Sequence, residues 1–535
     1  MTKTRDLADL GGGFIQAGTG AVQRTVESKL QDVVSVKDFG AVGNASVPDT
    51  AAIQAAINYA SLLASSGNSR GVIVEVPPGL YLLNATLTIN TSRVALRGAG
   101  RYRTVLIRNQ DYGNTISVDG PSLLEQIQIT GMSLFHDIGF GVAMTGTHIL
   151  WDDVHQGRIE DVLVENGAYG VAIYGGVDTV LDQVVMVGRN SATAGHNGQV
   201  GLLLERSGTG VVPLPTQIRG HSVRVFGPRV AGWNVGLQIN AAEDVSFESS
   251  YFGNQKLHNV LINQGGSKII LEATFGPGCY FDGAGNQSVV LTGSSGDGST
   301  YIGNTKFVGC NFKGQSGDGT DGLFIDGTVR AGAYPQAIRG VTVDSCTFSA
   351  FSRNGIWAVG GNNITVSNCQ IGGNNYFNST GGRGILVGAA VDGITVSGCR
   401  IGRNPEYSAV NSLQTYGIEV VSGATSVTLV NNDVRYNTTG GIAIPTAVTP
   451  KLVTNNLGYN GARPATAPAI PASTVALTNP YGSDAWVSIF GGTVSNISLN
   501  GQTVSGTSPL QLRVAANDNI ALTYTVAPAW VWWPS

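Results

Sequence analysis

Acidic side chains are scarce in this sequence, and those present gather in its first half. Asp and Glu make up 35 of the 535 residues, and most of them lie before residue 250. Two carboxyl groups held a few ångströms apart can cleave a glycosidic bond, because one donates a proton while the other attacks or activates water. Such a pair requires a fold that brings residues distant in the sequence to neighbouring positions.

Four short phrases in this region align with one another and place polar residues in matching columns. They are EDVLVEN at 160–166, DQVVMVG at 182–188, HSVRVFG at 221–227 and EDVSFES at 243–249. The first column contains Glu160, Asp182, His221 and Glu243, and the second contains Asp161, Gln183, Ser222 and Asp244. A third column, which we expect to point outward, contains Glu165, Val187, Phe226 and Glu248.

A second kind of phrase follows each of the first kind and begins with Gly and an inward apolar residue. Its outward positions form a column of Tyr174, Glu205, Asn240, Asn263 and Asp326. Glu205 is our first candidate for a catalytic acid, because it follows the inward Leu204 and so points outward next to Asn240. Glu248 and Asp244 are its favoured partners, since a neighbouring carboxylate raises the pKa of a carboxyl group. The predicted catalytic residues are Glu205, Asp244, Glu248, Asp182 and Glu243. The predicted substrate-binding residues are Tyr174, Trp233, Asn240, His221 and Arg224. Tyr174 or Trp233 would offer a sugar ring a flat surface.

These side chains also have a structural interpretation, because Asp and Asn are common at turns. LWDDVHQGR at 150–158 brings Trp151, Asp152, Asp153, His155 and Arg158 together, but we favour a turn around a buried Trp. Arg224 and Arg229 could hold an acidic sugar or simply lie on the surface. The aspartates of SGDGTDG at 316–322 would suit calcium, yet their spacing favours a plain β-turn, so no metal is predicted.

The element that would position these residues is a repeated coil. Similar phrases place Cys310, Cys346, Cys369 and Cys399 in one column, which Ser250 and Asn432 extend, at steps of 23 to 36 residues along the cysteines and Asn432. Repeats of this length indicate stacked structural units. Alternating apolar residues indicate strands, and parallel strands need crossover connections, which are almost always right-handed. The sequence therefore predicts an all-β, right-handed parallel β-helix with reduced, inward thiols.

The ends of the coil stack need covers, because a solenoid end exposes apolar surface and strand edges. A helix predicted at about 49–64, with Asp49 or Thr50 as its N-cap, is placed to cover the first coil. We divide the chain into an N-terminal segment at 1–34, a β-helix at 35–460, a Pro/Ala linker at 461–473 and a small C-terminal β module at 474–535.

Composition excludes several classes of protein. Charged residues are only 12% of the chain, the net charge is −4, and no basic stripe marks a nucleic-acid partner. No run of 18 apolar residues exists that would insert into a membrane, and the first residues lack an apolar stretch typical of a secretory signal. We therefore expect synthesis and folding in a reducing cytoplasm. The absence of a CxxC motif argues against a zinc site, and we predict no cofactor.

Several motifs near the N-terminus stand in an order typical of one family. They are GAVQRTVESKL, VSVKDFGA, the helix that follows, VPPGLY and LRGAG. The chain resembles bacteriophage and prophage tailspikes with a pectate-lyase-like β-helix, closely over its first 110 residues and by architecture beyond. This resemblance implies a homotrimer in the phage tail that binds, and commonly cleaves, a bacterial surface polysaccharide. It also implies attachment to the tail, the baseplate or an adaptor protein through the N-terminus, but it identifies no catalytic residue.

Two classes of function compete. In the first, the chain cleaves capsule or O-antigen, by hydrolysis with paired carboxylates or by a lyase reaction. In the second, it is a non-catalytic spike that binds a receptor or serves as structure. A secreted pectate-lyase-type enzyme is disfavoured by the N-terminal motifs. The acid-rich columns favour hydrolysis.

Two apolar features favour a homotrimer. Phe324, Trp357 and Leu386 form an outward column, and PAWVWWPS adds Trp530, Trp532 and Trp533, which a small module alone should leave exposed.

Overall fold

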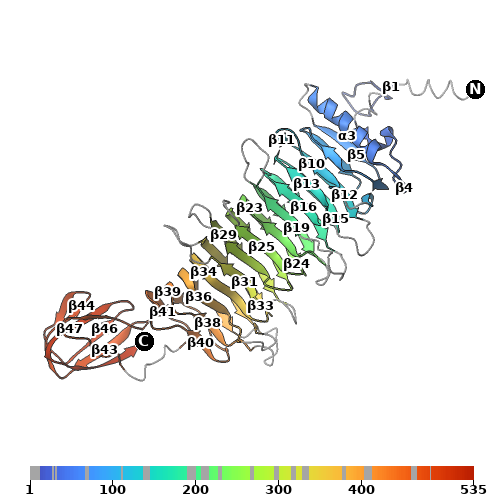
Figure 1. Ribbon diagram of the computed structural model, residues 1–535. Coiled ribbons are helices and arrows are strands. Elements are labelled where there is room, and N and C mark those ends of the chain that lie inside the picture. The colour runs from blue at the N-terminus through green and yellow to red at the C-terminus, as the bar shows by residue number, and fades with distance from the viewer. Residues whose placement is uncertain are drawn as a thin grey trace, which may run out of the picture. The chain divides into compact units, whose positions relative to one another are not determined.

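The structure is a computed structural model (Figure 1). It describes residues 13–26, 29, 33–66, 71–109, 113–136, 145–188, 200–206, 216–226, 232–264, 270–293, 301–314, 321–327, 337–375, 381–402, 413–459, 467–481 and 483–534. The chain divides into two compact units, residues 1–233 and 234–535. Within the described ranges, no helix combines the length and the apolar character needed to cross a membrane.

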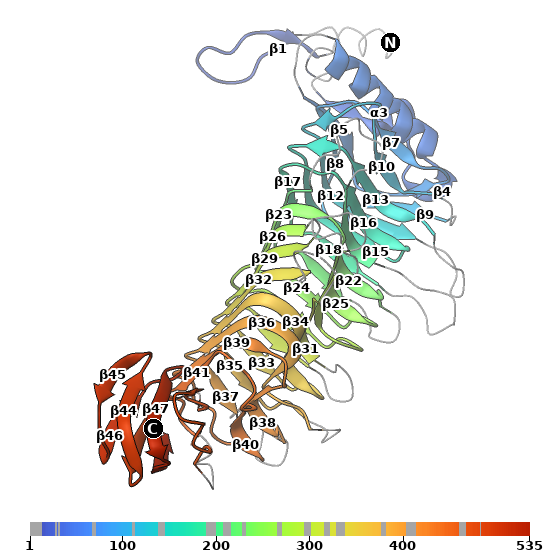
Figure 2. The same ribbon diagram turned by 60° about the vertical axis from the view of Figure 1, so that its left-hand side comes forward.

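Helix α3 (Thr50–Ser65) covers the start of the first unit, as predicted (Figure 2). Ile53, Ile57 and Ala60 on one of its faces are fully buried. Gln54 bonds through its side-chain amide to both the backbone N–H and the carbonyl of Thr88 in strand β7 (Leu87–Ile89), at 2.8 and 2.9 Å. The helix therefore covers apolar surface and also satisfies backbone groups that the first coil would otherwise leave exposed. The short helix η1 (Val36–Phe39) precedes it, and β1 (Gly13–Phe14) and β2 (Arg24–Thr25) form a separate antiparallel pair.

The first unit winds through three rows of parallel strands and one short side row. Row A contains β7 (Leu87–Ile89), β10 (Ile116–Val118), β13 (Thr147–Asp152), β16 (Tyr169–Tyr174) and β19 (Val200–Glu205). Row B contains β3 (Val34–Ser35), β5 (Val72–Val76), β8 (Val94–Gly98), the first halves of β12 (Gln128–His136) and β15 (Arg158–Glu165), β17 (Thr179–Asp182) and β20 (Ile218–His221). Row C contains β4 (Asn44–Pro48), β6 (Gly79–Leu83), β9 (Thr104–Arg108), the second halves of β12 and β15, β18 (Val185–Val187) and β21 (Arg224–Phe226). The side row pairs β11 (Leu124–Glu125) with β14 (Val154–His155).

The second unit repeats the three rows. Its row A contains β22 (Val235–Ile239), β25 (His258–Gln264), β28 (Val289–Gly293), β31 (Asp321–Asp326), the first halves of β34 (Asn354–Ser367) and β36 (Ile385–Ser397), β38 (Tyr416–Val420) and β40 (Gly440–Ala443). Row B contains β23 (Ala242–Glu248), β26 (Ile270–Phe275), β29 (Ile302–Val308), β32 (Ile338–Asp344), the second halves of β34 and β36, β39 (Thr425–Val430) and β41 (Lys451–Thr454). Row C contains β24 (Tyr251–Gly253), β27 (Tyr280–Asp282), β30 (Asn311–Lys313), β33 (Thr347–Ser349), β35 (Gln370–Gly372) and β37 (Arg400–Gly402).

Left-handed backbone conformations make the bend between rows B and C. Asp161, Gln183 and Ser222 in the first unit have φ of 50°, 53° and 53°. Asp244 in the second unit also has a positive φ, 57°, but it lies within β23 (Ala242–Glu248) in row B, and the bend before β24 (Tyr251–Gly253) falls at Ser249, with φ of 49°. The first three residues of the second predicted column thus stand at the bend, whereas Asp244, its fourth member, does not. Asp, Asn and Gly tolerate this conformation better than most residues, and Ser and Gln accept it at a cost. Asp161, Gln183 and Ser222 therefore have a structural role at the bend, independent of any role in chemistry.

All five cysteines form one buried stack of free thiols, which confirms the prediction of inward, reduced residues. Cys279, which the aligned phrases had missed, also belongs to it, because Tyr280 and Asn311 pair in register and bring Cys279 beside Cys310. Each thiol donates to backbone carbonyls near the bend, as Cys369 does to Ser367 at 3.1 Å. Asn432 ends the stack by accepting from the N–H of Cys399 at 2.9 Å. This buried position therefore suits any small side chain that can donate a hydrogen bond to the backbone carbonyl two residues before it.

We expect Cys369→Ser to lower the free energy of unfolding by only about 1–2 kcal/mol. Ser250 occupies the equivalent slot and donates to the carbonyl of Glu248 at 2.8 Å, so a hydroxyl can replace the thiol's bond. The shift in denaturation midpoint measures the effect. Cys369→Leu is the matched comparison, and overpacking should make it the worse of the two. A serine variant as unstable as the leucine variant would contradict this account of the slot.

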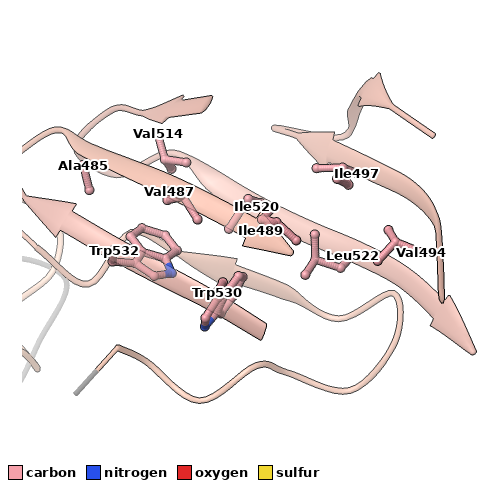
Figure 3. Close-up of a cluster of buried hydrophobic side chains, with 10 residues drawn as sticks. All are labelled: Ala485, Val487, Ile489, Val494, Ile497, Val514, Ile520, Leu522, Trp530 and Trp532. Atoms are coloured by element: carbon pink, nitrogen blue, oxygen red, sulfur yellow. The ribbon is translucent and has the colours of Figure 1, made fainter. Parts of the chain in front are cut away.

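The C-terminal module is a sandwich of two antiparallel sheets (Figure 3). One sheet contains β42 (Ala476–Thr478), β47 (Asn519–Val526), β44 (Thr493–Leu499) and β45 (Gln502–Ser505). The other contains β46 (Leu510–Val514), β43 (Ala485–Phe490) and β48 (Ala529–Pro534). Trp530 and Trp532 lie in the core between them, so the prediction that the module could not bury them is wrong. Part of the predicted linker lies outside the described residues, and the domain boundaries stay predictions.

Candidate functional site

An outward column in row A of the first unit brings two carboxylates to either side of a tyrosine. Asp152 pairs in register with Tyr174, and Tyr174 pairs with Glu205. The residue before each of them, Trp151, Ile173 and Leu204, is fully buried, so the three polar side chains point away from the core. Adjacent parallel strands lie about 4.8 Å apart, which puts the backbones of Asp152 and Glu205 roughly 10 Å apart.

Burial and nearby negative charge keep the phenol of Tyr174 protonated. Burial raises the pKa of its phenol first, and the negative charges of Tyr169 (when ionised), Glu205 and Asp152 raise it further. The Glu205 carboxylate accepts a hydrogen bond from the N–H of Arg206 at 3.1 Å, and the backbone carbonyl of Glu205 accepts from the Thr216 hydroxyl at 2.6 Å. The end of β19 is thus held in place, and a neutral hydrogen-bond donor stands in register between two carboxylates.

A second polar cluster lies on row B of the same unit. The guanidinium of Arg158 donates to Glu160 at 2.7 Å and to Asp182 at 3.1 Å, and Asp182 also contacts Nδ1 of His221 at 3.1 Å. Glu160, Asp182 and His221 pair in register, which confirms the first unit's part of the predicted column. The His221 side chain is 59% exposed. An imidazole oriented by a carboxylate can act as a base, and the exposed Arg224 on β21 adds positive charge.

Four more of the predicted residues lie in the second unit. Glu243, Asp244 and Glu248 are exposed on β23, and Asp244 lies within that strand, before the bend at Ser249. Asn240 accepts a hydrogen bond from Gln238 at 2.9 Å. The predicted column there omitted one residue, because Asn263 pairs with Thr292 and Thr292 pairs with Asp326. That Asp244 or Glu248 acts together with Glu205 stays a prediction.

Two residues that we predicted to be accessible on the outer face are buried in the structure. Trp233 is fully buried, so its indole offers no face to a sugar ring. Glu165 is also buried and its column partner Val187 nearly so, so the third column does not point outward in the first unit. Both residues stand where a strand meets a loop, and the apolar alternation that defines inward and outward positions stops there. Residues 316–320 of the suggested calcium loop, and Arg229, lie outside the described residues.

Two stacked histidines lie close to the backbone of Glu165, and the sequence predicted no role for them. The rings of His136 and His148 are 4.0 Å apart, and the Thr115 hydroxyl contacts both, at 3.3 and 3.2 Å. Nε2 of His148 contacts the backbone carbonyl of Glu165 at 3.0 Å. Burial, with the nearby charge of Arg108, lowers the pKa of His136 to about 4, and burial first, then His136, lowers the pKa of His148 well below its ordinary value.

We expect this histidine pair to make the protein less stable in mild acid. The unfolded chain takes up protons below about pH 6.5 whereas the folded chain does not, so stability is complete above that pH and falls as the pH drops toward 4. For His136 alone the loss by pH 5 is about 2 kcal/mol. Melting temperature as a function of pH measures it. His136→Gln should flatten the profile, and His221→Gln, at an exposed site, is the control. Equal acid sensitivity in wild type and His136→Gln would contradict the expectation.

Comparison with known proteins agrees with this architecture. A family model described as rhamnogalacturonase A/epimerase, pectate lyase-like, matches residues 33–259, and one described as right-handed beta helix region matches residues 236–518. The chain belongs to the right-handed β-helix family. The predicted hand of the β-helix and its pectate-lyase-like character are thereby confirmed. None of the curated proteins matches.

Solved structures share this β-helix at low sequence identity. The tailspike of E. coli bacteriophage HK620 is 11% identical with a TM-score of 0.56, over 98% of this chain and 96% of that one. PfbA, a surface adhesin of Streptococcus pneumoniae, is 13% identical with a TM-score of 0.52, over 73% and 92%. The Agl-KA catalytic domain is 16% identical with a TM-score of 0.51, over 76% and 69%. The resemblance to tailspikes is confirmed at the level of the fold, which an adhesin and an enzyme share.

Proposed function

We propose that this protein is a phage tailspike that binds a bacterial surface polysaccharide, capsule or O-antigen, and cleaves it by glycoside hydrolysis. The observation that carries the proposal is the outward column of Asp152, Tyr174 and Glu205. A similar β-helix, the HK620 tailspike, was solved in complex with a pentasaccharide, which supports the substrate class. We further propose a homotrimer in the virion that attaches through its N-terminus to the tail, the baseplate or an adaptor protein.

The spacing of the two carboxylates fits hydrolysis with inversion. Inverting glycosidases hold their carboxyl groups roughly 6.5–9.5 Å apart, which leaves room for a water molecule, and backbones two strands apart allow that separation. One carboxyl group would protonate the leaving oxygen while the other accepts a proton from the attacking water. The neutral Tyr174 hydroxyl between them can donate a hydrogen bond to a sugar oxygen.

Incubation of the purified protein with host capsule or O-antigen tests this function. We expect shortened oligosaccharides, detected by mass, with new reducing ends and the mass of one added water per cleaved bond. Binding without shortening would defeat the enzyme proposal and favour the non-catalytic receptor-binding spike.

The cluster on row B favours a second candidate, a polysaccharide lyase. His221 is oriented by Asp182, as a base that removes a proton from a uronate would need to be, and Arg158 and Arg224 could neutralise the acidic sugar. A lyase forms an unsaturated product that absorbs ultraviolet light and adds no water. Product absorbance together with loss of activity in His221→Gln would establish this alternative in place of hydrolysis.

A further inference from the structure

The outer face of one sheet in the C-terminal module exposes three large aromatic side chains. Trp486 and Phe490 on β43 and Trp533 on β48 are 48%, 45% and 44% exposed. Trp486 pairs directly with Trp533, and Phe490 lies on the same face four residues further along β43. Directly opposed residues on neighbouring strands have Cβ atoms about 5 Å apart, so the two indoles form one continuous aromatic surface.

This surface is not core left over from an incomplete sandwich. The opposite side of the same strands buries Val487, Ile489, Trp530 and Trp532 between the sheets, so the module has a core of its own (Figure 3). Three aromatic residues exposed on one side of a three-stranded sheet are costly to leave in water unless they bind something.

The size of the surface argues against a second copy of the chain as its partner. Aromatic side chains present about 150–250 Å² each, so three that are a little under half exposed offer roughly 300 Å². A stable interface between proteins buries about 800 Å² on each partner. A ligand of a few sugar rings matches the smaller area.

Polar groups border the aromatic surface and are held in fixed positions. Arg513 on β46 pairs with Trp486 from the other side and forms an ion pair with Asp484. The second oxygen of Asp484 accepts from the N–H of Ala516 at 3.1 Å. Ser488, between Trp486 and Phe490, pairs with Gln511. A pyranose ring has an apolar C–H face and a rim of hydroxyls, and this combination of flat aromatics and polar neighbours complements both.

We propose that the outer face of the β46–β43–β48 sheet is a saccharide-binding surface, built from other residues than the proposed cleavage site. Trp486 and Trp533 would stack on sugar rings, while Arg513, Gln511 and Ser488 would bond hydroxyls or a carboxylate. The inference rests on the proposed function for its ligand, the same surface polysaccharide, but it does not require that the polymer be cleaved.

The test uses the full chain and the purified host polysaccharide. Trp486→Ala and Trp533→Ala should each weaken binding roughly threefold to tenfold, and the double variant should weaken it more. Trp533→Phe should keep most of the affinity, because it keeps an aromatic face. Val504→Ala, an exposed apolar position on the other sheet, is the matched control and should bind as the wild type does. Cleavage of short oligosaccharides should be unchanged in all five variants.

The outcomes separate this inference from the proposed function. If the wild type binds and cleaves the polymer but the double variant binds it equally well, the saccharide surface is refuted and the proposed function stands. If the wild type binds without cleaving while the tryptophan variants bind less, the surface stands and hydrolysis falls. If the variants alter the mass of the assembly by light scattering but not the affinity for polysaccharide, the occupant is another copy of the chain and the inference is overturned.

Discussion

Glu205→Gln is expected to slow cleavage of the host polysaccharide by at least about a hundredfold, because a positioned acid or base contributes roughly 10²–10⁴-fold. Glutamine keeps the shape of the side chain and removes the titratable group. Asp152→Asn should produce a loss of the same order, since acid and base are both needed to cleave one bond. The rate of formation of reducing ends is the measurement, and near-identical circular dichroism shows that each variant is folded.

Two further variants make this result specific. Glu272→Gln changes an exposed carboxylate on β26 of the second unit and should leave the rate unchanged. Asp244→Asn tests the partner that the sequence had suggested. Wild-type rates in both Glu205→Gln and Asp152→Asn would show that the site lies elsewhere. Full activity in Asp152→Asn combined with its loss in Asp244→Asn would identify Asp244 as the partner of Glu205.

Paired replacement of Trp357 and Leu386 by Glu should convert a homotrimer into monomers. The predicted apolar column is present in row A of the second unit, where Phe324 pairs with Trp357 and Trp357 with Leu386. The same column continues through Val290, which pairs with Phe324, to Leu261, which pairs with Val290. Most of these side chains are half-buried in the single chain, and burying a charge against another copy would cost several kcal/mol. Light scattering at micromolar concentration should report about a threefold lower mass.

The control for the trimer is an exposed apolar residue outside the column. Leu257→Glu, at a position that is already well exposed, should leave the mass of the assembly unchanged. A wild-type protein that is monomeric at micromolar concentration would end the trimer proposal whatever the variants do. If the variant with both glutamates still has the mass of a trimer, the interface between the chains does not lie on row A.

Periodicity along the chain was sufficient to predict the fold. Strand alternation has a period of two and is local, so the inward positions of Cys369 and Leu204 could be read directly from their neighbours. Repeats of similar phrases then indicated the register, because in stacked coils equivalent residues of successive repeats pair with each other. This is why the pairs Asp182 with His221 and Tyr174 with Glu205 were predicted from aligned phrases and found in register.

Where the alternation of apolar and polar residues stops, only the tertiary structure decided which side chains are buried. Asp152 follows the inward Trp151 and so carried a signal, but no aligned phrase linked it to Tyr174, and its place beside that residue follows from pairing between coils. Trp233 and Glu165 stand at strand ends, where packing of loops determines burial. Trp530 and Trp532 are buried, and Trp533 is exposed, because a second sheet covers one side of β48 and leaves the other open. Such burial depends on surfaces from distant segments, which local patterns do not encode.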